Sequence, residues 1–339
     1  MRRVWLLSVG LMMTSCAPLP PIPFVTGADL AAPVVTDLRL VSPVELEVAF
    51  DEAVSVVSEP LGSASVGKVT LRTAETPAPA VGFLFEAAPS PAAEHHVEAQ
   101  VADVAGNHLR FVARFHGLNP MVPAMIINEL TTQGSGNHPD LVEIRVLTDG
   151  NLAGACLYEG VPENWDQRYI FPSVDVVAGD YLVVHFKPEG IPEEIDEVDS
   201  RDASGGLDAT PDGWDFWVPD GSGLSGNNGT IVLTENPLGG YIDAVLYSNR
   251  TSASDENYRG FGRRDVMERA DALAAAGAWN FSGEAIAPED AVDPDPSTGT
   301  RSMARGSDGA DTNSRSDWHI TPMRGLTPGT ENTDEVYEP

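Results

Sequence analysis

Hydrophobic and polar residues alternate along residues 33–117 with the period of a β-strand. Leu46, Val48 and Phe50 are separated by Glu47 and Ala49. A period of two places alternate side chains on opposite faces, one buried and one in water, as in the sheets of a β-sandwich. The same alternation recurs at Val97, Ala99 and Val101, and again at Leu109, Phe111, Ala113 and Phe115.

A tight turn is predicted between the last two of these runs. Ala105-Gly106-Asn107 separates them, and Gly and Asn tolerate the positive φ that hairpin turns require. Together with Ser42-Pro43, Phe50-Asp51-Glu52, Val54, Asp103 and Phe115, this hairpin resembles the opening and closing motifs of bacterial immunoglobulin-like domains. The resemblance implies a first β-sandwich over residues 33–118.

A second set of strand-like runs occupies residues 119–332. Ile126–Leu130 and Asp140–Ile144 resemble the first two strands of lamin-tail domains. The similarity continues in order through Leu152–Gly154, Ala178–Val184, Leu224–Leu233, Asp243–Tyr247, Arg301–Arg305, Asp311–Ser314, Asp317-Trp318, Thr327–Gly329 and Asn332. It implies an immunoglobulin-like sandwich of the kind used as an interaction module. The expected fold class is therefore mainly β, with two tandem sandwiches and a polar tail at residues 333–339.

Two insertions, and a loop that returns the chain to the last strands, are expected in the second sandwich. Lys187 to Asp220 is rich in acidic residues, Pro and Gly, which predicts a solvated loop. Asp290 to Gly299, with two prolines, predicts an extended loop.

The second insertion, Arg263 to Gly277, predicts one short helix. Asp265 and Glu268 have the spacing of a capping box, and Gly277 suits the C-terminal cap. The apolar residues on one helical face, which are expected to pack on the sandwich, are Val266, Ala270, Leu273 and Ala274.

The N-terminal sixteen residues have the pattern of an export signal. Arg2 and Arg3 precede an apolar run from Val4 to Met13, which is too short to span a bilayer, and Met13-Thr14-Ser15-Cys16 follows. This segment resembles the lipobox of bacterial lipoproteins. The resemblance implies removal of residues 1–15 and acylation of Cys16 with fatty chains such as palmitate. An ordinary secretory leader with an incidental cysteine and an uncleaved start are the alternatives.

The segment after Cys16 is expected to connect the anchor to the folded part. Residues 17–32 contain four prolines, which favour extended backbone and predict a linker. Ala17 is compatible with sorting to the outer membrane in well-studied lipoproteins. The expected location is the cell envelope, at the outer membrane or the cell surface, with the lipid as the membrane contact.

The composition is strongly acidic, with 20 Lys and Arg against 51 Asp and Glu and a net charge of −31. Binding of nucleic acid needs clustered basic residues, so a nucleic-acid partner is disfavoured. Cys156 is the one cysteine besides Cys16, so acylation of Cys16 leaves no pair for a disulfide within the chain. Cys156 lies in an apolar run, where a buried, unreactive thiol is expected.

Sequence motifs for catalysis are not apparent. The run from Gly221 to Gly226 lacks the spacing of a nucleophile elbow and predicts a flexible turn, and His-Glu-x-x-His does not occur. His95 and His96 are adjacent on a predicted strand, so their side chains point to opposite faces and do not share a metal. His319 is expected to pack on a strand or to form a hydrogen bond at the rim.

Two groups of acidic residues are weak candidates for a structural calcium ion, which needs about six to eight oxygen ligands. Neither group has EF-hand spacing, and Asp and Asn are common in turns without a metal, so no calcium is the favoured interpretation. The groups are Asp208, Asp212, Asp215 and Asp220, and Asp308, Asp311, Asn313 and Asp317.

Three tryptophans lie in or beside the polar loops. Trp165, Trp214 and Trp217 are candidates for a binding surface, because aromatic side chains offer a large contact area. The alternative, which we favour, is that they hold the loops on the sandwich.

These observations predict a lipid-anchored, exported protein that is not an enzyme and whose lamin-tail-like sandwich binds or scaffolds a protein or an envelope polymer. Two alternatives remain. One is a hydrolase, or an accessory subunit of one, that acts on envelope glycans or phosphoesters through paired carboxylates. The other is a purely structural spacer.

Overall fold

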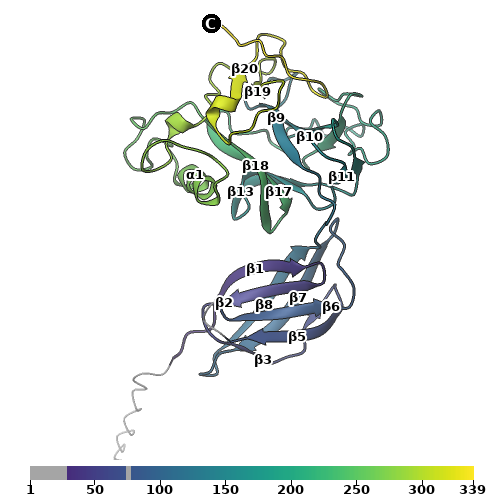
Figure 1. Cartoon of the computed structure of the whole chain (residues 1–339), viewed down its shortest axis with the longest axis vertical. Coiled ribbons are helices and arrows are strands. Elements are labelled where there is room, and N and C mark those ends of the chain that lie inside the picture. Colours follow the sequence, from purple (N-terminus) through teal and green to yellow (C-terminus); the bar gives the residue numbers. More distant parts are fainter. Residues whose placement is uncertain (1–28, 74–77) are drawn as a thin grey trace, which may run out of the picture.

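A computed structural model describes residues 29–73 and 78–339, which form two β-sandwiches joined end to end (Figure 1). The expected fold class, mainly β with one short helix, is confirmed. The predicted signal segment, Cys16 and residues 17–28 of the linker lie outside the described residues.

The first sandwich pairs a four-stranded sheet, in the order β1-β2-β6-β5, with a sheet in which β7 pairs with β8, β3 and β4. Its strands are β1 (Val35–Ser42), β2 (Glu45–Phe50), β3 (Ser55–Val56), β4 (Leu61–Gly62), β5 (Val66–Arg72), β6 (Ala80–Phe85), β7 (Glu94–Ala102) and β8 (His108–His116). The predicted alternation is confirmed at Leu46, Val48 and Phe50, which are fully buried in the core between the sheets.

The predicted hairpin joins β7 to β8, with Ala102 opposite His108. Gly106 has φ of 90°, which is the left-handed conformation that the turn needs. Asp103 fixes the turn, because its two carboxylate oxygens accept hydrogen bonds from the backbone and the side-chain amide of Asn107, at 2.8 and 2.7 Å. The Asp-x-x-Gly-Asn run therefore stabilises the turn of the hairpin.

The second sandwich pairs a six-stranded sheet, β16-β15-β10-β9-β19-β20, with a four-stranded sheet, β13-β12-β17-β18. Its strands are β9 (Met125–Thr131), β10 (Leu141–Val146), β11 (Gly150–Asn151), β12 (Cys156–Val161), β13 (Asn164–Ile170), β14 (Asp175–Val176), β15 (Tyr181–His185), β16 (Trp214–Trp217), β17 (Asn228–Asn236), β18 (Gly239–Ser248), β19 (Met303–Arg305) and β20 (Trp318–Ile320). The two runs expected to be its first strands correspond to β9 and β10, which are antiparallel neighbours.

The predicted helix is α1 (Arg264–Ala276), which contacts β12, β17 and β18 of the four-stranded sheet. Val266, Ala270 and Leu273 are buried as the spacing predicted, and Gly277 ends the helix with φ of 67°. The predicted capping box is wrong. Arg263 occupies the N-cap without a side-chain cap, because Asp265 pairs with Arg263 and Glu268 pairs with Arg264.

The acidic segment Lys187–Asp220 is not the solvated loop that its composition predicted. It contains β16, which pairs in parallel with β15 and buries Phe216 and Trp217. Two of its acidic side chains, Glu197 and Asp215, are also buried. The acidic residues are accommodated because their carboxylates accept hydrogen bonds from backbone amides of the same segment.

Carboxylates of this segment cover the outer edge of β16. Glu197 accepts a hydrogen bond from the amide of Asp215 at 2.9 Å, and Asp196 accepts one from the amide of Trp217 at 2.8 Å. Glu197 also accepts from the amides of Ala203 and Ser204. An edge strand exposes unpaired backbone groups that template aggregation, so this cover closes one end of the sheet.

The segment Asp290–Gly299, predicted as an extended loop, is tied closely to the sandwich. A 3-10 turn, η1 (Pro288–Asp290), precedes it, and Val292 forms an isolated bridge with Tyr247 of β18. A second 3-10 turn, η2 (Arg315–Asp317), leads into β20.

The two sandwiches contact each other directly. Leu238, in the turn between β17 and β18, packs against the core of the first sandwich. Asn119, in the connection, donates hydrogen bonds to the carbonyls of Asn151 and Ala153 at 2.6 and 3.0 Å. In the described ranges, no helix combines the length and the apolar character needed to cross a membrane.

Candidate functional site

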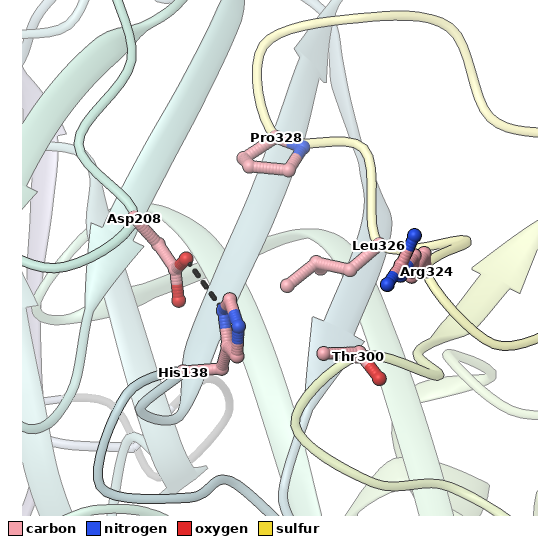
Figure 2. Close-up of a pocket in the computed structure, with 6 residues that line it drawn as sticks. All are labelled: His138, Asp208, Thr300, Arg324, Leu326 and Pro328. Atoms are coloured by element: carbon pink, nitrogen blue, oxygen red, sulfur yellow. Dashed lines mark hydrogen bonds and ion pairs between the residues drawn. The ribbon is translucent and has the colours of Figure 1, made fainter.

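A pocket of about 310 Å³ opens beside the six-stranded sheet, where four segments distant in sequence meet (Figure 2). His138 comes from the β9–β10 loop, Asp208 from the β15–β16 segment, and Thr300 from the turn before β19. The fourth segment is the C-terminal loop, residues 322–332, which contributes Arg324, Leu326 and Pro328. Pockets of this size on a rigid scaffold are typical of sites for small ligands.

His138 and Asp208 form a hydrogen-bonded pair at the pocket wall. The imidazole Nδ1 lies 2.9 Å from Oδ1 of Asp208, so the protonated Nδ1 donates to the carboxylate and Nε2 is left toward the pocket (Figure 2). The hydroxyl of Ser135 accepts a hydrogen bond from the amide of His138 and fixes the loop. The pair is thus positioned by the loop before substrate or ligand arrives.

Asp208 and Arg324 both have strained backbones. Their φ values are 61° and 65°, in the left-handed region that side-chain-bearing residues rarely adopt. The Oδ2 atom of Asp208 is buried and has no hydrogen-bond partner. Strain and an unmet buried acceptor are costs of folding that natural proteins concentrate at functional sites.

Beneath the pocket, two buried glutamates hold the C-terminal loop on the sheet. Glu129 of β9 lies opposite Glu143 of β10. Glu129 accepts a hydrogen bond from the amide of Thr327 at 2.9 Å, and Glu143 accepts one from the amide of Gly329 at 2.7 Å. The pocket wall formed by Leu326 and Pro328 is therefore fixed on both sides of residue 328.

The glutamate pair titrates far from the ordinary range of a carboxyl group. Burial raises the pKa of Glu129 to about 7, although hydrogen bonds from Ser302 and Thr327 oppose the shift. Burial and the nearby Glu129 raise the pKa of Glu143 well above its usual value. Both side chains are fully covered, and they bind the backbone of the C-terminal loop.

The second group of calcium candidates surrounds an arginine. Arg305 of β19 is fully buried, and its guanidinium pairs with Asp243, Asp311 and Asp317 at 2.9, 3.1 and 3.4 Å. The remaining members do not join them. Asp308 accepts from the amide of Ala310, and Asn313 occupies a turn with φ of 53°. The positive charge that pairs with Asp311 and Asp317 is therefore the guanidinium of Arg305.

The first group of calcium candidates is not brought together. Asp208 binds His138, Asp215 binds the buried His185 at 2.8 Å, and Asp220 occupies a turn with φ of 56°. The backbone amide of Asp212 donates a hydrogen bond to the Thr210 hydroxyl at 3.2 Å. In the part of the chain that the structure describes, a close acidic group of three is instead Asp29, Glu52 and Asp103, in the first sandwich.

The three candidate tryptophans have different environments. Trp217 is buried and stacks on His185, with ring centroids 3.9 Å apart, and Trp214 is half-buried and donates to Asp180. These two hold the acidic segment on the sheet, as the favoured interpretation predicted. Trp165 is 41% exposed beside Arg168, so it alone of the three offers surface for a partner.

The remaining residues singled out in the sequence lie in structural settings. His95 of β7 packs beside Phe115 of β8. The adjacent His96 is exposed on the other face of β7, as predicted. His319 approaches the carbonyl of Thr333 at 2.9 Å, which is a rim hydrogen bond. Cys156 is fully buried, as expected, and burial raises the pKa of its thiol to about 12, which favours the neutral thiol over the nucleophilic thiolate.

A family model matches most of the second sandwich. A family model described as "protein second domain" matches residues 123–320, which is more than half of the chain. The chain belongs to this family. His138, Asp208 and Thr300 lie within the matched residues, whereas Arg324, Leu326 and Pro328 follow them.

The relative found among curated proteins carries no assigned activity. It is an "Uncharacterized protein" of Treponema pallidum (strain Nichols), 29% identical over 160 residues. The match spans 45% of this chain and 40% of that protein, so the chain covers less than half of its relative. No solved structure matches this chain.

Proposed function

We propose that this chain is an exported, lipid-anchored binding protein of the cell envelope, and that it is not an enzyme. The first sandwich is a spacer, and the second carries the binding site in the pocket at His138. The tether is Cys16, whose sequence context resembles a lipobox. The partner is a component of the envelope, bound through loops on a rigid β scaffold.

The pocket is the observation that carries the proposal. Four separate segments converge there, and two of its residues have strained backbones. Two of the calcium candidates in the second sandwich, Asp311 and Asp317, pair with the buried Arg305 instead. The resemblance to lamin-tail domains, which serve as interaction modules, supports the same role.

The tether is tested by replacing Cys16 with Ser in the full chain. The wild type is expected to fractionate with membranes and to give an N-terminal peptide that begins at Cys16 with an added acyl mass. Two or three acyl chains anchor a protein stably because each buried methylene contributes about 0.8 kcal/mol, so Cys16→Ser is expected in the soluble fraction. Cys156→Ala removes the other cysteine and is expected to stay with membranes. A wild-type chain that starts at Met1 without acyl mass would contradict the tether.

The binding role is tested by capture of cross-linked envelope components on the full chain. The double variant Asp208→Asn, Arg324→Gly is expected to lose the components that the wild type retains, because it removes two charges of the pocket. Asn and Gly both tolerate positive φ, so the fold is expected to persist. The control Arg264→Ala removes an exposed charge on α1 and is expected to capture normally. Equal capture by all three proteins would show that the pocket is not the binding site.

A further inference from the structure

We infer that the pocket at His138 binds the zwitterion of an α-amino acid with an aliphatic side chain. The inference rests on the proposed function, because it assigns a ligand class to the proposed binding site. In the bound state, Asp208 receives the ammonium group, Arg324 and Thr300 receive the carboxylate, and Leu326 and Pro328 contact the side chain.

The acidic side of the pocket is the carboxylate of Asp208. Oδ1 of Asp208 is occupied by His138, and Oδ2 is buried without a hydrogen-bond partner. A buried acceptor that has lost water and gained no donor costs free energy. The side chain of Asp208 lines the pocket and is 13% exposed, so an ammonium group beside it brings the opposite charge to a carboxylate that has one hydrogen-bond donor.

The basic side of the pocket is provided by Arg324. In a chain with 51 acidic residues, Arg324 forms no ion pair within the described residues, whereas Arg201, Arg269 and Arg305 each pair with an aspartate. Arg324 is exposed at the pocket mouth. A guanidinium presents two parallel N–H groups to a carboxylate, and Thr300 lies on the same side of the pocket as Arg324 (Figure 2).

The apolar side of the pocket is rigid. Leu326 and Pro328 flank Thr327, whose amide is bound by Glu129, and Gly329 is bound by Glu143. A preformed apolar wall favours a ligand with a compact aliphatic group, since no side chains must be ordered on binding. One pocket thus presents a carboxylate, a guanidinium and an aliphatic wall.

The backbone strain supports a ligand at this position. Five non-glycine residues in the described ranges have positive φ, and two of them, Asp208 and Arg324, line this pocket. The two residues assigned to the opposite charges of the ligand are thus both held in an unfavourable conformation. Selection for side-chain chemistry at these positions explains why neither is glycine.

The inference is tested by titration calorimetry of L-leucine into the purified full chain in detergent at pH 7. L-leucine is expected to bind. L-leucinamide, which lacks the carboxylate, and N-acetyl-L-leucine, which lacks the ammonium, are each expected to bind at least tenfold more weakly. Leucinamide binding as tightly as leucine would overturn the inference, because the site would then take the amino end of a peptide without using Arg324.

Two variants and a control locate the site. Asp208→Asn and Arg324→Gly are each expected to weaken leucine binding at least tenfold, and both residues suit the left-handed backbone. Arg264→Ala, on α1, is expected to bind as the wild type does. Wild-type affinity in both pocket variants would overturn the inference. Absence of heat with leucine, combined with capture of envelope components that depends on the pocket, would overturn the ligand class and leave the proposed function standing.

Discussion

Replacing Arg305 with Met is expected to lower the free energy of unfolding of the second sandwich by about 3–5 kcal/mol, because removing one partner leaves buried charges uncompensated. Arg305 is fully buried, and its guanidinium lies 2.9 Å from Asp243, which is also buried. Burial raises the pKa of Asp243 to about 6 while Arg305 lowers it, so loss of the arginine removes the opposing charge. Urea denaturation monitored by tryptophan fluorescence measures the change.

The same substitution on the surface is the matched control. Arg264 is exposed on α1 and pairs with Glu268 one helical turn away. Such pairs contribute about 0.5 kcal/mol or less, so Arg264→Met is expected to leave the unfolding midpoint nearly unchanged. Equal and small losses in the two variants would show that the Arg305 network does not stabilise the sandwich.

The role of Arg305 was beyond sequence analysis because its partners are distant in the chain. Asp243 precedes it by 62 residues, on a strand of the other sheet. Asp311 and Asp317 are close to Arg305 in sequence, and both belong to the group that the sequence offers as a weak calcium site. The local sequence shows that several carboxylates lie close together, but it does not show whether a metal ion or a buried arginine such as Arg305 balances their charge.

Local periodicity, by contrast, was sufficient for the strands and for α1. The alternation at Leu46, Val48 and Phe50 predicted which face is buried, and Gly277 marked the end of the helix. These features depend on side chains within a few residues of one another. The strand β16 was not predicted, because a long acidic segment separates it from its partner β15. The many acidic residues of that segment favoured a solvated loop.

The pocket residues also gave little signal along the chain. His138 follows Gly, Ser and Asn in a turn-forming run, and 70 residues separate it from Asp208. Neither residue type is unusual in a loop. Only the folded chain brings the two together and shows that the backbone of Asp208 is strained.

Glu129 and Glu143, by contrast, do carry a signal in the sequence. They are charged residues at positions of apolar strands that are expected to be buried.

The stability of the second sandwich is expected to fall as the pH rises from about 4.5 to about 7. Burial raises the pKa of Glu129 to about 7 in the folded state, against an ordinary value of 4.5. Between these values the folded chain binds more protons than the unfolded chain, so a rise in pH favours unfolding. A shift of this size corresponds to a loss on the order of 3 kcal/mol. Glu143, with a pKa well above its usual value, continues the decline toward higher pH.

Glu129→Gln isolates this effect, because glutamine keeps the shape of the side chain and carries no charge. Its carbonyl accepts from Thr327, and its amide donates to the Ser302 hydroxyl, both of which contact Glu129 in the wild type. We expect the variant to match the wild type near pH 4.5, to exceed it in stability at pH 8, and to show a shallower decline between these values. Urea denaturation at intervals across this range provides the measurement.

The control for this variant is Glu268→Gln, at an exposed position on α1, which is expected to retain the pH dependence of the wild type. Carboxyl groups with a lowered pKa do not alter the pH dependence of stability between pH 4.5 and 8, where the variants and the wild type are compared. Glu289 has its pKa lowered by hydrogen bonds from the Ser252 backbone and hydroxyl, so its contribution is lost only as the pH falls below the ordinary range of a glutamate. A Glu129→Gln variant with the same slope as the wild type would show that this carboxyl group is ionised throughout, and the C-terminal loop would then be held by a charged pair.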